Sequence, residues 1–298
     1  MNYVITGGAG HISKPLVLEL LKKGHQVTVL GRSATNLQEL VDAGAKAAIG
    51  SVEDRSFLTR EFAGADAVYL MIPPIKQPEN WKTEIGKIGE NYAAALKETG
   101  VKYAVLLSSV GAHMPNGCGP VSGLFLAEQA LDKVPGLNLL KLRPGYFYIN
   151  FLGNIPMIKT AQIMGSNFGG TADKIILSST DDIADAAAAA LLKLNFKGST
   201  VRYLVSDEKN TADIAAAIGK TIDQPELPWV PFTDEQLEQG LLAAGLAPQV
   251  AKNYTEMGTA IRSGQMFEEY RTSPDIQKGT RSFDTFLPQF KAVYTASK

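Results

Sequence analysis

The stretch that decides the fold begins near the amino terminus and reads Thr6-Gly7-Gly8-Ala9-Gly10-His11-Ile12-Ser13. An apolar run, Tyr3 to Ile5, enters it, a helical pattern from Lys14 to Lys23 leaves it, and a second apolar run covers Gln26 to Leu30. Glycines in such a turn let the backbone bend tightly and approach a pyrophosphate, which the amides of the next helix then face. The order strand, glycine turn, helix, strand therefore predicts a dinucleotide-binding unit rather than a mere tight turn.

The rest of the first half repeats this alternation of strand and helix patterns. Repeated strand–helix units imply parallel strands joined by right-handed crossovers. We therefore expect an α/β fold in which residues 1–150 form a doubly wound parallel-sheet Rossmann domain. After Arg143-Pro144-Gly145 the alternation gives way to residues 146–170, which are rich in aromatic residues and glycine. Residues 151–298 are predicted to form a smaller, mostly helical substrate lobe, with one strand or helix returning to the first domain.

One helix of this second half has a clear start signal. Thr180 can cap it, and Asp181 and Asp182 in the first turn complement the helix dipole. We interpret these carboxylates as dipole partners rather than as an acid–base pair.

The composition limits the partners and the compartment. Apolar residues make up 45% of the 298-residue chain, charged residues 20%, and the formal net charge is −1. Such a charge gives no electrostatic reason to expect a nucleic acid or an anionic membrane as a partner. The sequence contains neither a signal-peptide pattern nor an apolar run of transmembrane length. We expect a soluble, cytoplasmic protein.

Metal ligands and disulfides are not predicted. The single cysteine, Cys118, excludes an internal disulfide, and a free thiol in a loop is expected. The histidines His11, His25 and His113 lie far apart and show no metal-ligand spacing.

The end of the second predicted strand indicates which dinucleotide is bound. NAD-binding units usually place an acidic residue there to hold the ribose 2′-hydroxyl, whereas a basic residue accommodates the 2′-phosphate of NADP. This chain has Leu30-Gly31-Arg32-Ser33. Arg32 either offers a charge-assisted fork to the phosphate or faces solvent as most arginines do. Its placement favours NADP, and hence NADPH, as the cofactor.

Further stretches resemble a known family. Together with the glycine turn and Gly31-Arg32-Ser33, the runs Leu106 to Ala112, Leu142 to Phe151 and Thr180 to Asp185 are similar to the NmrA-like, atypical short-chain dehydrogenase/reductase group. The resemblance extends from residue 1 to about residue 290. It implies a Rossmann domain with a small carboxyl-terminal lobe. It also implies either reduction of quinones and other carbonyl compounds with NADPH, or NADP binding by a non-catalytic redox-sensing regulator.

The resemblance also implies where the cofactor touches the chain. The glycine turn would hold the phosphates, with Ser13 in place of the family's third glycine, where it can cap the helix and bond a phosphate. The adenine, ribose and nicotinamide would follow the ends of the later strands. The predicted contacts are Thr6, Gly7, Gly10, His11, Ile12, Arg32, Ser33, Ser51, Val52, Ile72, Pro73, Ser108, Gly145, Tyr146 and Phe147.

The sequence departs from the family at the catalytic pair. Short-chain dehydrogenases use a Tyr-x-x-x-Lys pair in which lysine lowers the tyrosine pKa. The expected helix, Pro120 to Glu128, contains neither residue. His113 could supply a proton instead, or lie in water as a loop histidine, and Tyr146 could donate a hydrogen bond or only pack. Ser108 stands at the position of the family's catalytic serine.

Two functions remain open at this point. A quinone accepts hydride directly, so an apolar pocket can suffice without the missing pair. The sequence therefore predicts an NADPH-dependent oxidoreductase acting on a small, apolar quinone-like or carbonyl acceptor. The alternative is a non-catalytic NADP(H)-sensing regulator that acts through a protein partner.

Overall fold

The computed structural model describes residues 1–169 and 174–297, so Gly170 of the aromatic stretch lies outside it. Its main feature is an eight-stranded sheet in the order β13-β10-β6-β5-β4-β1-β2-β3, with parallel neighbours throughout. The strands are β1 (Asn2–Ile5), β2 (Gln26–Gly31), β3 (Lys46–Ile49), β4 (Ala67–Leu70), β5 (Tyr103–Leu107), β6 (Asn138–Pro144), β10 (Ser199–Val205) and β13 (Ile276–Lys278).

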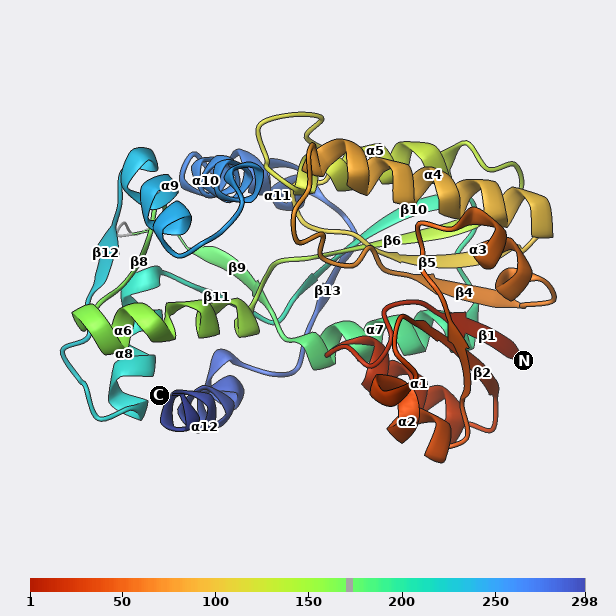
Figure 1. Cartoon of the computed structure of the whole chain (residues 1–298), viewed down its shortest axis with the longest axis horizontal. Helices are drawn as coiled ribbons and strands as arrows, with labels where there is room; N and C mark the ends of the chain where they lie inside the picture. Colours follow the sequence, from red (N-terminus) through yellow and green to blue (C-terminus); the bar gives the residue numbers. More distant parts are fainter. Residues whose placement is uncertain (170–173, 298) are drawn as a thin grey trace.

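Helices cover both faces of this sheet (Figure 1). One face carries α1 (Ser13–Lys22), α2 (Ala34–Asp42) and α7 (Thr180–Lys193), and the other carries α3 (Arg55–Phe62), α4 (Trp81–Thr99) and α5 (Val121–Asp132). Successive strand residues alternate between the two cores. In β1, for example, Tyr3 and Ile5 pack with α1 and α7, while Val4 packs with α3 and α4. The doubly wound fold predicted from the sequence is confirmed.

Two glycines let α4 and α5 lie unusually close together. A Cβ atom at Gly89 would lie 2.4 Å from the Cα of Ala127, and one at Gly123 would lie 2.7 Å from the Cβ of Ile85. Any larger side chain would push the helices apart. This contact fixes α5 against the sheet and so determines where its inward-facing side chains point.

The second half contains a smaller lobe with short strands (Figure 1). Its strands form two small sheets, β7 (Tyr146–Phe147), β9 (Ile175–Ser178) and β11 (Asp207–Lys209) in one, β8 (Met164–Ser166) and β12 (Trp229–Pro231) in the other. Its helices are α6 (Ile155–Ala161), α8 (Thr211–Thr221), α9 (Asp234–Ala243), α10 (Pro248–Arg262), α11 (Glu268–Thr272) and α12 (Leu287–Ala296), with 3-10 segments at Tyr148–Asn154, Gln265–Phe267 and Phe283–Phe286. Buried aromatic rings, including Phe151, Phe283 and Phe290, form its core.

The second half also returns to the large sheet. The sequence predicts one returning strand or helix, whereas two strands, β10 and β13, join the sheet and α7 packs against α1. The helices of the described chain include none with both the length and the apolar character that a bilayer crossing requires.

The start of α7 differs from the sequence-based expectation. Ser179, not Thr180, caps this helix, because its side chain accepts from the amide of Asp181 at 3.3 Å. Asp182 is only 4% exposed and accepts from Ser206 Oγ and from Arg281 Nη1, each at 2.6 Å. Burial favours the neutral acid, but these hydrogen bonds hold the pKa of Asp182 below its ordinary value. Asp182 therefore anchors the segment after β13 and is more than a dipole partner.

Candidate functional site

The strand order places one edge of the sheet at a topological switch point. The chain leaves β1 for β2 on one side, whereas β4 lies on the other side of β1. In open α/β sheets, ligands bind outside the carboxyl ends of the strands at such a point. Because the end of β2 receives the adenosine ribose, the nicotinamide half would lie over the ends of β4, β5 and β6. We call this part of the edge the nicotinamide end.

The glycine turn after β1 has the geometry that a phosphate site needs. Gly7 and Gly8 have φ angles of +98° and +57°, in the left-handed region that favours glycine. The first turn of α1 contains no acidic residue and has no side-chain cap. The amides of His11 and Ile12 donate to no group in the described part of the chain. Unpaired amides at a helix start bind anions, so the turn fits a pyrophosphate.

Replacing Gly7 by alanine tests the crowding at this turn. A Cβ there would lie 2.5 Å from Ser13 Oγ and 2.7 Å from Met71 Cε. We expect a loss of about 1–3 kcal/mol in the free energy of unfolding, measured by urea titration. Gly24→Ala is the matched control, because Gly24 also has a positive φ (+80°) but meets nothing within 4 Å. Equal losses in the two variants would show that the turn is not crowded.

The side chains of Thr6 and Ser13 form hydrogen bonds within the protein. Thr6 Oγ1 accepts from the amide of Met71 at 2.7 Å, which joins the end of β1 to the end of β4. Ser13 Oγ donates to the carbonyl of Thr6 at 2.9 Å, and both residues are buried. The expectation that Ser13 caps α1 is wrong, because its hydroxyl donates to Thr6 and no side chain caps this helix. A bond between Ser13 and a phosphate stays a prediction. Both residues fix the shape of the turn.

At the end of β2, where the adenosine ribose is expected, the side chain of Arg32 supplies a positive charge. Arg32 is exposed, and no carboxylate or carbonyl of the described residues pairs with it. Ser33 caps α2 by accepting from the amide of Asn36 at 3.4 Å. Farther along the edge, Ser51 Oγ accepts from the amide of Glu53 at 3.2 Å, and Val52 is half-buried beside it.

The nicotinamide end combines half-buried side chains with one obligatory glycine. Ile72 and Pro73 follow β4, and Tyr146 and Phe147 form β7; all four are half-buried. A Cβ at Gly145 would lie 2.4 Å from the carbonyl oxygen of Ile176, so only glycine lets β7 lie against β9. Its role visible in the structure is therefore packing.

Tyr146 keeps its proton at ordinary pH. Burial, with a smaller contribution from Tyr254, raises the pKa of Tyr146 well above its usual value. Its ring packs against Phe151 and Phe168. Tyr146 can therefore donate a hydrogen bond from its hydroxyl, but it is a poor proton source.

A buried ion pair, which the sequence analysis did not identify, lies beside Ser108. Ser108 Oγ donates to Glu128 Oε1 at 2.5 Å. Arg143 binds the same carboxylate through Nε at 3.0 Å and Nη2 at 2.6 Å. Burial lowers the pKa of Arg143, but its bonds to Glu128 more than offset this and raise it above its ordinary value. Because Ser108 already donates its hydroxyl hydrogen to Glu128, this hydroxyl is not free to donate to a substrate.

The ion pair continues into the second half of the chain. Arg143 Nη1 donates to Tyr203 Oη at 3.0 Å and also to Glu269 of α11. Tyr203 Oη donates to Glu269 Oε2 at 2.8 Å, and His113 Nδ1 lies 3.7 Å from the same oxygen. We call Ser108, Glu128, Arg143, Tyr203 and Glu269 the Arg143 network.

A sequence signal for this network did exist. Arg143 lies near the end of the buried strand β6, and Glu128 follows the apolar run of α5. Charges in buried segments must be paired, since an unpaired buried charge is very costly. The spacing alone could not say that these two pair with each other.

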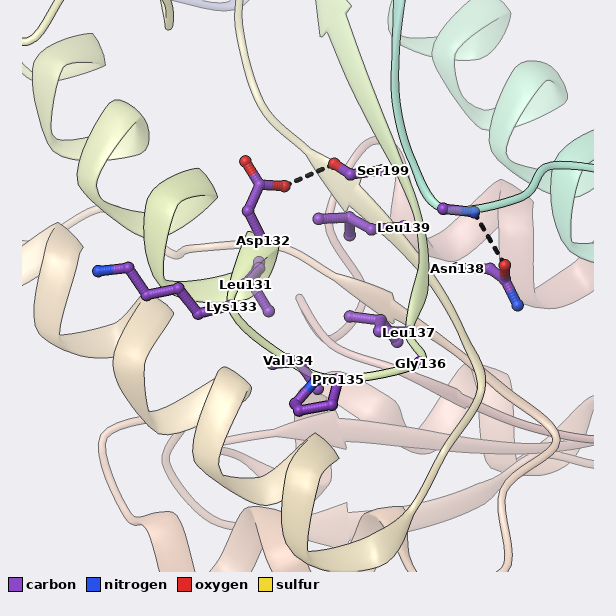
Figure 2. A pocket seen from close by; sticks show the side chains of 11 residues that line it. Leu131, Asp132, Lys133, Val134, Pro135, Gly136, Leu137, Asn138, Leu139 and Ser199 are labelled. Carbon is purple, nitrogen blue, oxygen red and sulfur yellow. Dashed lines mark hydrogen bonds between the residues drawn. The ribbon is translucent and has the colours of Figure 1, made fainter.

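A cavity of about 390 Å³ lies at the opposite edge of the sheet (Figure 2). It is bounded by residues 131–139 and by Gly198 and Ser199, at the starts of β6 and β10. Its polar groups are already paired, since Asp132 accepts from Ser199 Oγ at 2.5 Å and Asn138 accepts from the amide of Gly198 at 3.0 Å. This cavity lies away from the switch point.

The fold and the glycine turn define an NAD(P)-binding protein of the Rossmann class. Residues 7–148 match the family model described as NAD(P)H-binding. The matched residues include the glycine turn and Gly31-Arg32-Ser33, on which the resemblance to the NmrA-like, atypical short-chain dehydrogenase/reductase group partly rests.

The similar proteins include several reductases. A (4-alkanoyl-5-oxo-2,5-dihydrofuran-3-yl)methyl phosphate reductase from Streptomyces griseus is 24% identical over 88% of this chain and 87% of its own. An NADPH-dependent quinone oxidoreductase from Escherichia coli, solved with NADPH, has a TM-score of 0.80 at 21% identity and covers 96% of this chain and 99% of its own. A triphenylmethane reductase from Citrobacter sp., solved with NADP(H), has a TM-score of 0.76 at 19% identity over 99% and 100% of the two chains.

Proposed function

We propose that this protein is an NADPH-dependent oxidoreductase that passes hydride to a small quinone-like or carbonyl acceptor. The observation that supports the proposal is that two features lie at the same edge of the sheet. A turn with unpaired amides suits the cofactor phosphates, and an apolar cluster adjoins the nicotinamide end. The reductase names of similar proteins support the same reaction class.

The apolar cluster is built from both halves of the chain. Ile72, which follows β4, packs against Trp81 and Ile85 of α4 and against Val250 of α10. Trp81 and Val250 are only 6% and 7% exposed. An apolar wall of this kind favours an apolar acceptor and keeps water from the reacting atoms.

The chain's own residues would bind and orient the reactants. When bound, NADPH supplies the hydride. The turn at Gly7 would hold the pyrophosphate, Arg32 the 2′-phosphate, and Ile72 one face of the nicotinamide end. Helix α5 carries neither tyrosine nor lysine, so the usual catalytic pair does not act here. A quinone needs less acid catalysis than an aldehyde, because it is the stronger electrophile.

Steady-state NADPH oxidation tests this proposal. We expect turnover with benzoquinones and naphthoquinones, and slower turnover with aldehydes, in each case above a protein-free blank. NADH should support lower activity at equal concentration. Tight NADPH binding without oxidation by any acceptor would contradict the proposal.

One observation favours the regulatory alternative. Ser108 occupies the position of the family's catalytic serine, yet its hydroxyl is committed to Glu128. A protein that only senses NADP(H) needs no free serine. This alternative requires different affinities for oxidised and reduced cofactor, because a ligand that binds both states equally cannot shift an equilibrium. Equal affinities and absence of turnover would exclude both functions.

A further inference from the structure

A ring nitrogen of His113 is buried beside the nicotinamide end without a hydrogen-bond partner in the described chain. His113 belongs to the loop that follows β5. This loop continues alongside β6, because the amide of Val110 donates to the carbonyl of Pro144 at 2.9 Å. The side chain is 22% exposed, while its Nδ1 is buried. Nδ1 therefore faces inward, while another part of the side chain remains accessible.

The group that faces Nδ1 is a carboxylate held in place by the Arg143 network. Glu269 Oε2 lies 3.7 Å from Nδ1 and is fixed by Tyr203 Oη at 2.8 Å and by Arg143. A carboxylate in this position accepts a hydrogen, so it selects the ring form with the hydrogen on Nδ1 and leaves Nε2 for the other partner. Such contacts are often long without substrate and tighten in the reacting complex.

The charges around His113 suit a proton held on the ring. Glu269 of α11 faces it directly, Arg143 and Tyr203 bind Glu269, and Glu128 of α5 binds the other side of Arg143. Farther along, Lys141 lies near Glu128 and pairs with Asp132, so two cations, Arg143 and Lys141, face three carboxylates. This leaves one excess negative charge, which an imidazolium would balance. Burial favours neutral Glu269, but its bonds to Tyr203 and Arg143 hold the pKa of Glu269 below its ordinary value, so it stays a carboxylate.

The other hydroxyl groups near this edge are less suited to give up a proton. Tyr148 Oη donates to the carbonyl of Arg281 at 2.8 Å, and Ser108 Oγ donates to Glu128. Tyr146 has no such bond within the described part of the chain, but burial raises its pKa and it retains its proton. His113 is the remaining candidate for a general acid beside this edge.

We propose that His113, oriented by Glu269, donates the proton that accompanies hydride transfer, an inference that rests on the proposed oxidoreductase function. In a carbonyl acceptor, the carbon takes the hydride with its electron pair and the π pair moves to oxygen. In a quinone, one carbonyl oxygen takes the hydride and the π electrons shift through the ring to the other oxygen. That oxygen takes a proton from His113 Nε2, and the dihydronicotinamide is oxidised. The imidazole then regains a proton from water. Glu269 acts as a positioning residue.

The first test needs no cofactor or turnover. Ring ¹⁵N NMR of the cofactor-free protein can distinguish its three histidines by comparison with single His→Asn variants. We expect the neutral ring of His113 to carry its hydrogen on Nδ1, and Glu269→Ala to change this tautomer. Glu269 is half-exposed, with 48% of its side chain accessible, so this variant should still fold. A tautomer that is unchanged by Glu269→Ala would overturn the role of Glu269.

The second test measures catalysis. His113→Asn should lower quinone turnover by about 10²-fold or more, without changing the Kd for NADPH. His25→Asn is the matched control, since His25 lies just before β2, with its ring beside the amino terminus of the chain. Equal turnover in the two variants, with an active wild type, would refute this inference alone; an inactive wild type would refute the proposed function.

Discussion

Replacing Arg143 by methionine should lower the free energy of unfolding by about 3–5 kcal/mol, as expected when one partner of a buried ion pair is lost. Glu128, which is 2% exposed, would be left with only the Ser108 hydroxyl as a hydrogen-bond partner in the described chain. Lys141 Nζ, 3.8 Å from Glu128 Oε2, offers partial compensation and favours the lower end of this range. Urea unfolding followed by circular dichroism measures the loss.

Two further variants separate burial from charge. Arg55→Met removes an exposed pair, since Arg55 and Glu98 are 58% and 54% exposed, and should cost less than about 1 kcal/mol. The double variant Glu128→Leu/Arg143→Met should recover most of the stability, because apolar residues of similar volume can replace a buried pair. If Arg143→Met lost no more stability than Arg55→Met, the stabilising role of the Arg143 network would be contradicted.

Replacing Arg32 by aspartate should weaken NADPH binding by about a hundredfold while changing NADH binding little. A charge-assisted hydrogen bond contributes about 1.5–3 kcal/mol, and each 1.4 kcal/mol is about tenfold in affinity. The introduced carboxylate would add repulsion from the 2′-phosphate. NADH has no such phosphate, so its affinity reports any general damage to the site. Fluorescence titration of the reduced cofactors measures both Kd values.

Arg271→Asp is the control for net charge. Arg271 is exposed on α11, far from β2 in the chain, and its substitution changes the charge by the same amount. It should leave both affinities unchanged. If Arg32→Asp and Arg271→Asp gave the same NADPH affinity, Arg32 would not read the 2′-phosphate.

The Rossmann domain could be predicted because its signals are local. The glycine turn joins β1 to α1 within a few residues, and apolar strand runs alternate with helical periodicity up to β6. The helix expected at Pro120 to Glu128 corresponds to α5, which begins at Val121 and continues to Asp132. Pro120 precedes this start, and the close packing at Gly123 stabilises the first turn.

The second half could not be predicted to the same extent, because its contacts join residues far apart in the chain. Strands β7, β8, β9 and β11 have two to four residues, too few for a periodic pattern. The bond between Arg143 and Glu269 spans 126 residues. The contacts of the cofactor with Arg32, Ser51 and Phe147 remain predictions, since they need a ligand to be measured.

The most direct measurement is the stoichiometry of a single anaerobic turnover. Protein, NADPH and a naphthoquinone are mixed without oxygen, and cofactor oxidation and quinol formation are followed together. We expect one quinol to form for each NADPH consumed. At the same low NADPH concentration, the Arg32→Asp variant should lose this reaction. Bound NADPH that stays reduced beside unchanged quinone would contradict the first expectation.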